Sequence, residues 1–265
     1  MRDFTMEVYK QLLITLKDKG FQFIPFKDYF DQHASRFVIL RHDVDAKKMN
    51  SLESARIEYQ MGITGTYYFR VLPKSYDQQV IREIASMGHE IGYHYETMDT
   101  SKGNIDQAYS EFCSNLLNFR LLYPIITICM HGSPLSKYDN REIWKKYDYH
   151  SHGIIGEPYF DLDFSTMLYL TDTGRRWDGE KVSVRDKIIK EAHGNDGSDV
   201  PPALHLRHTK DIINALNNGI FPDKVMITVH PQRWNNNYFS WLKEAMLQNV
   251  KNQLKKFLIK RKRTL

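Results

Sequence analysis

The sequence predicts an α/β protein, a distorted (β/α)7-type barrel forming a single domain with a C-terminal helix. Short runs that suit strands alternate along the chain with longer stretches of helical spacing. The strand runs are continuously apolar, which is typical of parallel strands covered by helices. About seven such runs in 265 residues fit a barrel or a strongly curled sheet.

The elements follow one another in a regular order after an opening helix. Most of the strands are rich in β-branched or aromatic residues, and several helices end near glycine, proline or asparagine. The expected strands are Phe37–Leu40, Thr66–Val71, Glu90–Tyr95, Ile125–Met130, Gly153–Ile155, Met167–Thr171 and Lys224–Val229. The expected helices are Val8–Leu16, Ser51–Met61, Asp77–Met87, Ile105–Leu122, Thr209–Asn217 and Tyr238–Leu258. We expect 1–36 to lead into the barrel, 37–235 to form it, and 236–265 to add a helix with a basic tail, while the loop-rich 172–208 forms a wall or lid.

Composition limits the classes of function. Cys113 and Cys129 are far apart, which argues against a disulfide framework and a thiolate metal site. No window approaches the roughly 18 uninterrupted apolar residues of a membrane span. Residues Met1–Glu7 carry early charges and no apolar signal-peptide core, so we expect a cytoplasmic protein.

The net charge of +5 is concentrated at the end of the chain, between Lys251 and Arg263. Without this tail the chain is nearly neutral, so we do not expect nucleic acid as a partner. A basic amphipathic end either rests on an anionic membrane surface or forms a solvated last helix, and both alternatives stay open.

The most informative stretch is Phe37–Leu40 followed by Arg41-His42-Asp43-Val44-Asp45. Alternate residues of a strand share a face, so Asp43 and Asp45 point the same way. Two converging carboxylates repel each other unless a cation, a proton or a donor lies between them. The alternative interpretation is a polar loop in which Asp45 caps the next helix.

Other ionisable residues also follow the ends of strands. His94 and Glu96 share a face after the third strand, which suits one divalent metal ion. His131 follows the fourth strand and could ligate the metal or contact substrate. His230 follows the last strand and suits a general acid, with Asp172 as the carboxylate that orients it.

Together these motifs resemble the polysaccharide deacetylases of the NodB-homology type, carbohydrate esterase family 4, from about Phe37 to Trp234. Asp43-Val44-Asp45 loosely matches the family's Asp-Asp-Gly motif, and Gly88–His94 closely matches Gly-His-Glu-Ile-Gly-Asn-His. His230-Pro231 is similar to the Leu-x-x-His-Pro motif. The resemblance implies a distorted barrel, a divalent metal and removal of N- or O-acetyl groups from sugars.

The resemblance also implies a role for each matched residue. Asp43 would be the catalytic base, Asp45 and His94 metal ligands, and His230 the general acid supported by Asp172. The metal would be zinc, with cobalt, manganese or nickel as alternatives. Two departures mark a divergent branch. Met98 occupies the place of the family's second histidine ligand, so Glu96 or His131 must complete the metal site, and His131-Gly132-Ser133-Pro134 replaces the Arg-x-Pro motif.

The expected function is metal-dependent removal of an acetyl group from a sugar or sugar conjugate, used in surface-polysaccharide synthesis. Tyr95, Trp177 and Trp234 would provide apolar faces for a sugar ring, and Arg175 (or its neighbour Arg176) would hold an anionic group of the carbohydrate substrate. The alternatives are another metal-dependent hydrolase, of phosphoesterase or amidohydrolase type, and an inactive carbohydrate-binding relative.

Overall fold

The computed structural model describes residues 2–133, 136–178 and 204–262, with the backbone alone from 254 to 262. The strands are β1 Gln22–Phe23, β2 Phe37–Val44, β3 Thr66–Phe69, β4 Glu90–Tyr95, β5 Ile128–Met130, β6 Leu168–Thr171 and β7 Lys224–Val229. The helices are α1 Met6–Asp18, α2 Lys48–Gln60, α3 Gln78–Ser86, α4 Thr97–Thr100, α5 Ile105–Arg120, α6 Pro158–Asp161, α7 Thr209–Asn217 and α8 Tyr238–Lys262.

The seven strands form one sheet in which every pairing is parallel. The strand order is β5-β4-β3-β2-β7-β6, and β1 pairs with the start of β2. In the described part of the chain no pairing joins β5 to β6, so the ring of strands is open there.

An apolar cluster fills the concave side of this sheet. It joins Phe37 and Ile39 of β2 to Tyr68 of β3, Cys129 of β5 and Met226 of β7. Because residues from distant strands of the sheet meet in one cluster, the sheet must curl around it. The fold class predicted from the sequence, an α/β distorted barrel with a parallel sheet, is confirmed.

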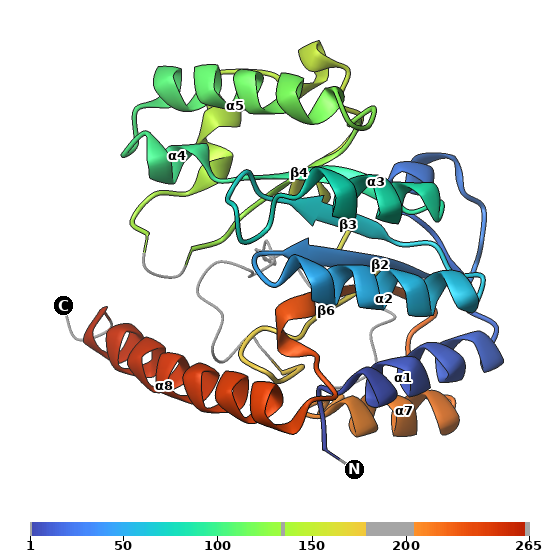
Figure 1. Ribbon diagram of the computed structural model, residues 1–265. Coiled ribbons are helices and arrows are strands. Elements are labelled where there is room, and N and C mark those ends of the chain that lie inside the picture. Colours follow the sequence, from blue (N-terminus) through green and yellow to red (C-terminus); the bar gives the residue numbers. More distant parts are fainter. Residues whose placement is uncertain (1, 134–135, 179–203, 263–265) are drawn as a thin grey trace.

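Helices cover the convex side. One buried cluster joins α1 and α7 to β2, β6 and β7, and another joins α2, α3 and α5 to β3, β4 and β5. Figure 1 shows α1, α2, α3 and α7 lined up along the same side of the sheet. Because α1 contributes Leu12, Leu13 and Leu16 to the first cluster, the opening helix shares its core with the sheet.

β2 is longer than predicted and is buried along its whole length. The sequence analysis ended this strand at Leu40, but the strand continues to Val44 because its polar residues find partners on both sides of the sheet. Arg41 and Asp43 pair with each other on the concave side. His42 lies on the convex side, where its ring contacts Tyr9.

Two other expectations about local structure are wrong. Residues Gly153–Ile155 form no strand, because Gly153 ends a 3-10 helix at a φ of 67° and the pairing shrinks to one bridge between Thr127 and Gly156. Asp45 does not cap the following helix. α2 begins after Lys47, which has a φ of 52°, and no side chain caps that end.

None of the described helices is long and apolar enough to cross a membrane. Cys113 and Cys129 form no disulfide.

Gly92 on β4 provides a test of the packing inside the sheet. A Cβ at this position would lie 2.2 Å from Cε1 of the buried Tyr68 ring. We expect Gly92→Ala to lower the free energy of unfolding by roughly 1–3 kcal/mol, measured by urea denaturation, because a close-packed interior absorbs extra volume poorly. In a Tyr68→Leu background the same substitution should cost less, and equal costs in both backgrounds would contradict the proposed clash.

Candidate active site

Strands from both halves of the sheet deliver ionisable side chains to one edge. Asp43 lies near the end of β2 and Asp45 just beyond it, while His94 lies on β4. His131 follows β5 and His230 follows β7. Because all these strands are parallel, their carboxyl ends meet at the same edge, and the sequence prediction that these residues come together agrees with the coordinates.

Three of these side chains form a triangle of potential metal ligands. His131 Nδ1 lies 3.0 Å from Asp45 Oδ1 and 3.3 Å from His94 Nε2. His94 Nε2 lies 3.7 Å from Asp45 Oδ1. Ligands about 2.1 Å from a tetrahedral metal ion are separated by about 3.4 Å, so the triangle has the size of one face of such a site.

The chemistry of the three atoms also fits a metal ion. Asp45 Oδ1 is buried and accepts no hydrogen bond from the described residues. His94 Nδ1 contacts the carbonyl oxygen of Cys129 at 2.9 Å, which leaves Nε2 turned toward the site. A backbone carbonyl on the far ring nitrogen is a common way of orienting a metal-binding histidine.

The charges of this triangle depend on each other. Burial alone would raise the pKa of Asp45, but the charge of His131 lowers it well below its ordinary range. Burial opposes the charged form of His131, yet Asp45 raises its pKa. Burial lowers the pKa of His94 to about 4, so this imidazole is neutral near pH 7. Asp45 and His131 therefore stabilise each other's charged forms, an effect that a cation bound between them would replace.

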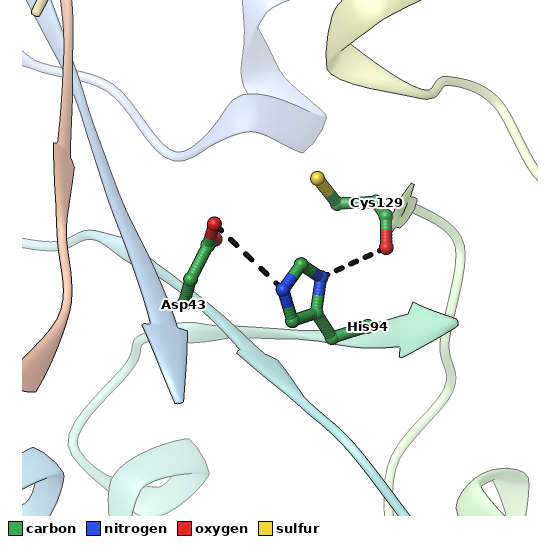
Figure 2. A group of neighbouring side chains, drawn as sticks. All are labelled: Asp43, His94 and Cys129. Carbon is green, nitrogen blue, oxygen red and sulfur yellow. Dashed lines mark hydrogen bonds and ion pairs between the residues drawn. The ribbon is translucent and has the colours of Figure 1, made fainter. Parts of the chain in front are cut away.

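Asp43 lies beside the triangle but is held differently. Figure 2 shows it facing His94, whose Nε2 is 3.8 Å from Asp43 Oδ2. Arg41 donates two hydrogen bonds to the Asp43 carboxylate, at 2.8 and 2.7 Å. Burial would raise the pKa of Asp43, but Arg41 and His94 lower it, so the group stays ionised.

Figure 2 also shows Cys129, which together with Asp43 and His94 makes a second set of potential ligands. In this set the carboxylate is already bound by Arg41, and the thiol lies at 3.6 Å from the carbonyl oxygen of Met130. Asp45 has an unsatisfied oxygen and Asp43 does not. The set of Asp45, His94 and His131 is therefore the better metal site.

His230 and Asp172 form a dyad at the same edge. Asp172 Oδ1 lies 2.6 Å from His230 Nδ1, and Asp172 Oδ2 accepts the backbone N–H of His230 at 2.9 Å. Arg233 also donates to this carboxylate, as does Trp234 Nε1 at 2.8 Å. Burial would raise the pKa of Asp172, but Arg233 and His230 lower it to about 2. The other nitrogen of His230, Nε2, lies 3.9 Å from Asp45.

Glu96, predicted as an alternative metal ligand, is not brought to the triangle. Its carboxylate accepts two hydrogen bonds from Arg70, one of them at 2.9 Å from Nε. Met98 is buried in the apolar cluster on the convex side. Of the two residues that could complete the site in place of Met98, the geometry favours His131.

The three aromatic residues predicted to face a sugar are packed in the core, which corrects their assignment. Tyr95 points to the convex side of β4, where its hydroxyl accepts the N–H of Trp144 at 2.8 Å. Trp177 and Trp234 belong to the cluster around α1 and are 3% and 0% exposed. None of these rings is open to a ligand.

Arg175 lies near the dyad rather than at the triangle. It donates to the carbonyl oxygen of Arg233 at 2.9 Å, and its guanidinium lies over the Phe4 and Trp241 rings. Burial lowers its pKa. The wall or lid expected from 172–208 lies largely outside the described residues, which omit 179–203.

Sequence reasoning missed the partners of the acidic residues. Arg41, Arg70 and Arg233 each bind one carboxylate of the edge. Arg41 could have been found, because a residue two positions before Asp43 on a strand shares its face. The other two depend on contacts between separate segments, which no local pattern shows.

No family model and no curated protein matches the chain. Among solved structures it is similar to the Xyl-CE4 domain of a multidomain xylanase from the hindgut metagenome of Trinervitermes trinervoides. The two are 12% identical, with 83% of this chain and 85% of that chain covered and a TM-score of 0.37. A likeness this distant does not indicate chemistry.

The buried Glu157 supports the segment that carries His131, and its titration can be tested. Its carboxylate accepts the backbone N–H groups of Met130 at 2.9 Å and Tyr159 at 2.6 Å. Burial raises its pKa from 4.5 to about 7. Between these values the folded protein holds a proton that the unfolded chain has lost, so this group's contribution to stability falls as pH rises from about 4.5 to about 7.

We therefore expect the unfolding free energy of the wild type, relative to Glu157→Gln, to fall by on the order of 3 kcal/mol across that interval. Urea denaturation of both proteins at several pH values measures this difference, and titrations shared by the two proteins cancel. A difference that does not change with pH would show that Glu157 ionises normally.

Proposed function

We propose that the protein is a metal-dependent hydrolase that removes an acetyl group, N- or O-linked, from a sugar or sugar conjugate. The observation that supports this most directly is the meeting of a three-ligand triangle with a separate histidine–aspartate dyad. Asp45 contacts both parts, because Oδ1 belongs to the triangle and Oδ2 lies 3.9 Å from His230 Nε2. A metal site next to an oriented histidine is an arrangement that can catalyse hydrolysis of an amide or ester.

Asp45, His94 and His131 would hold the metal ion, and their mixed nitrogen and oxygen donors suit zinc. Bound there, a divalent ion would acidify a water molecule and polarise a carbonyl group. Asp43 lies 3.8 Å from the same nitrogen of His94, Nε2, and stays ionised through Arg41. It is therefore placed to accept the proton of an attacking water.

His230 would supply the proton that the leaving group needs. Asp172 fixes Nδ1, so Nε2 is the nitrogen that faces the triangle. Asp172 is fully buried, and its carboxylate fixes the orientation of the His230 ring. Protonation by Nε2 would let an amine or alkoxide depart.

The choice of an acetylated sugar as substrate rests on the motifs that resemble carbohydrate esterase family 4, and the role in surface-polysaccharide synthesis is part of the same proposal. Acetate release from acetylated amino sugars and from acetyl esters of sugars tests the substrate class. Release of phosphate from phosphate esters, without acetate release, would favour a phosphoesterase instead.

Metal analysis separates the two candidate third ligands. We expect the purified protein to bind one divalent ion, and His131→Ala to weaken binding by more than about 100-fold, because removing a ligand costs more than removing its support. Asp45→Ala and His94→Ala should behave like His131→Ala. Isothermal titration with zinc and elemental analysis measure the change.

Glu96→Gln is the matched control. Glu96 directly follows β4, the neighbour of the strand that precedes His131, but its carboxylate is hydrogen-bonded to Arg70. Its zinc affinity should stay within about threefold of the wild type. A loss of zinc in Glu96→Gln together with normal binding in His131→Ala would reverse the assignment.

The acid role of His230 predicts a separation of kcat from binding. His230→Ala should lower kcat by about 10²–10⁴, the usual contribution of a general acid, while the zinc content stays unchanged. Steady-state kinetics with an acetylated substrate, combined with metal analysis of the same samples, measures both. Equal losses of kcat and zinc affinity would mean that His230 supports the metal rather than the leaving group.

A further inference from the structure

α8 contacts the rest of the protein through its polar side. The indole N–H of Trp241 donates to the carbonyl oxygen of Asp3 at 2.7 Å, and Asn252 donates to that of Gly174 at 2.9 Å. Gln248, seven residues after Trp241, is 5% exposed. Positions 241, 248 and 252 share one face of a helix, and this face lies on the body of the protein.

The opposite face of α8 is apolar and exposed. This face carries Phe239, Met246 and Val250. These residues repeat at the spacing of positions 241, 248 and 252 but lie two positions earlier, which rotates them by about 200° around the helix axis. They are 78%, 63% and 59% exposed, and Leu247 beside them is 48% exposed. An amphipathic helix of a globular protein normally turns its apolar face to the core. α8 does the reverse, so its apolar face lacks a partner among the described residues.

The charge around α8 points to an anionic partner. Residues 245–265 hold seven of the 37 lysines and arginines and none of the 32 aspartates and glutamates. The rest of the chain has 30 basic against 32 acidic residues, so it is close to neutral. A second copy of α8 on this face would bring two such basic segments together, and like charges oppose that pairing.

A cationic recess lies beside the helix on its inner side. It has a volume of about 290 Å³ and is bordered by α8 and by the segments after β6 and before α7. Its lining includes Arg175, Arg207 and His208, together with Asn249 of α8, and also Arg176, which is paired with Asp178. Basic and amide side chains can bind the phosphate of a lipid headgroup. Such headgroups lie at the same depth as the polar side of a helix in the membrane interface.

We propose that α8 docks the protein on the surface of an anionic phospholipid bilayer, with Phe239, Met246 and Val250 in the membrane interface and the exposed Lys243 and Lys251 beside them. The helix has 25 residues and a length of about 37 Å, which suits binding along a flat surface. The proposal concerns the helix and is independent of the hydrolysis proposed above.

Docking in this way would bring the candidate active site close to the bilayer. Lys47, two residues after Asp45, lies 3.6 Å from Glu244 of α8, and Asn252 contacts the segment that follows β6. Figure 1 shows α8 extending on the side to which the arrowheads of β2 and β3 point. The edge that carries the site and the apolar face of α8 therefore belong to one end of the molecule.

Vesicle binding tests the proposal. We expect the full-length protein to co-sediment with vesicles of phosphatidylcholine and phosphatidylglycerol, but not with phosphatidylcholine alone, and high salt should weaken the binding. Met246→Glu/Val250→Glu should lower the partition coefficient at least about tenfold, because it puts acids on the apolar face. Lys243→Glu/Lys251→Glu should lower it by a similar factor through charge alone.

Leu117→Glu/Leu121→Glu is the matched control, because these leucines of α5 and its end are 65% and 81% exposed but far from α8 in the sequence. This variant should bind like the wild type. Equal binding to both kinds of vesicle, or none to either, would overturn the proposal. So would a wild-type dimer in light scattering that Met246→Glu/Val250→Glu converts to a monomer, because the face would then pair with a second copy. Acetate release from a soluble substrate, measured in parallel, reports on the hydrolase separately.

Discussion

The site depends on the register of the parallel strands around β2. Asp43 is opposite Tyr68 of β3, and His94 is opposite Cys129 of β5, so the residues that follow these strands reach the edge at the same height. A slip of one residue would turn the whole set of side chains to the other face of the sheet. The concave apolar cluster and the two convex clusters hold the register, because β2, β3 and β4 are buried along their whole length. Packing throughout the fold therefore places the site.

The acidic residues of the edge differ in how their charges are compensated, and this difference separates their roles. Asp43, Glu96 and Asp172 each receive an arginine within hydrogen-bonding distance. The guanidinium of Arg70 lies 3.9 Å from Asp45, and the closer partners are the imidazoles of His131 and His94 and the neutral amide of Gln232, which donates to Oδ2 at 3.2 Å. A half-buried carboxylate whose close partners are imidazoles and an amide has less permanent positive charge near it than its neighbours have. A divalent cation would supply that charge, which is the physical reason for assigning the metal to Asp45 rather than to Asp43.

The sequence predicted which residues reach the edge, because that depends on where strands end and which face alternate residues share. It could not separate Glu96 from His131 as ligands, since the answer depends on Arg70, which lies on a different segment. The direction of the Tyr95 side chain could have been predicted by the same reasoning. If His94 faces the concave side, the next residue of the strand must face the helices. The burial of Trp177 and Trp234 could not have been predicted, because it depends on Phe4 and α1, more than 150 residues away along the chain.

Met98 and His131 are linked through one side chain, which explains how this chain would position the proposed ligand His131 without a histidine at 98. Asn140 is 1% exposed, accepts the backbone N–H of Met98 at 2.9 Å and donates to the carbonyl oxygen of His131 at 2.7 Å. Glu157 holds the preceding residue, Met130, from the other side. The backbone of His131 is therefore fixed by two buried polar side chains, although it lies outside any strand. A ligand held in this way loses little conformational freedom when it binds a metal ion, so its support makes up for its position on a loop.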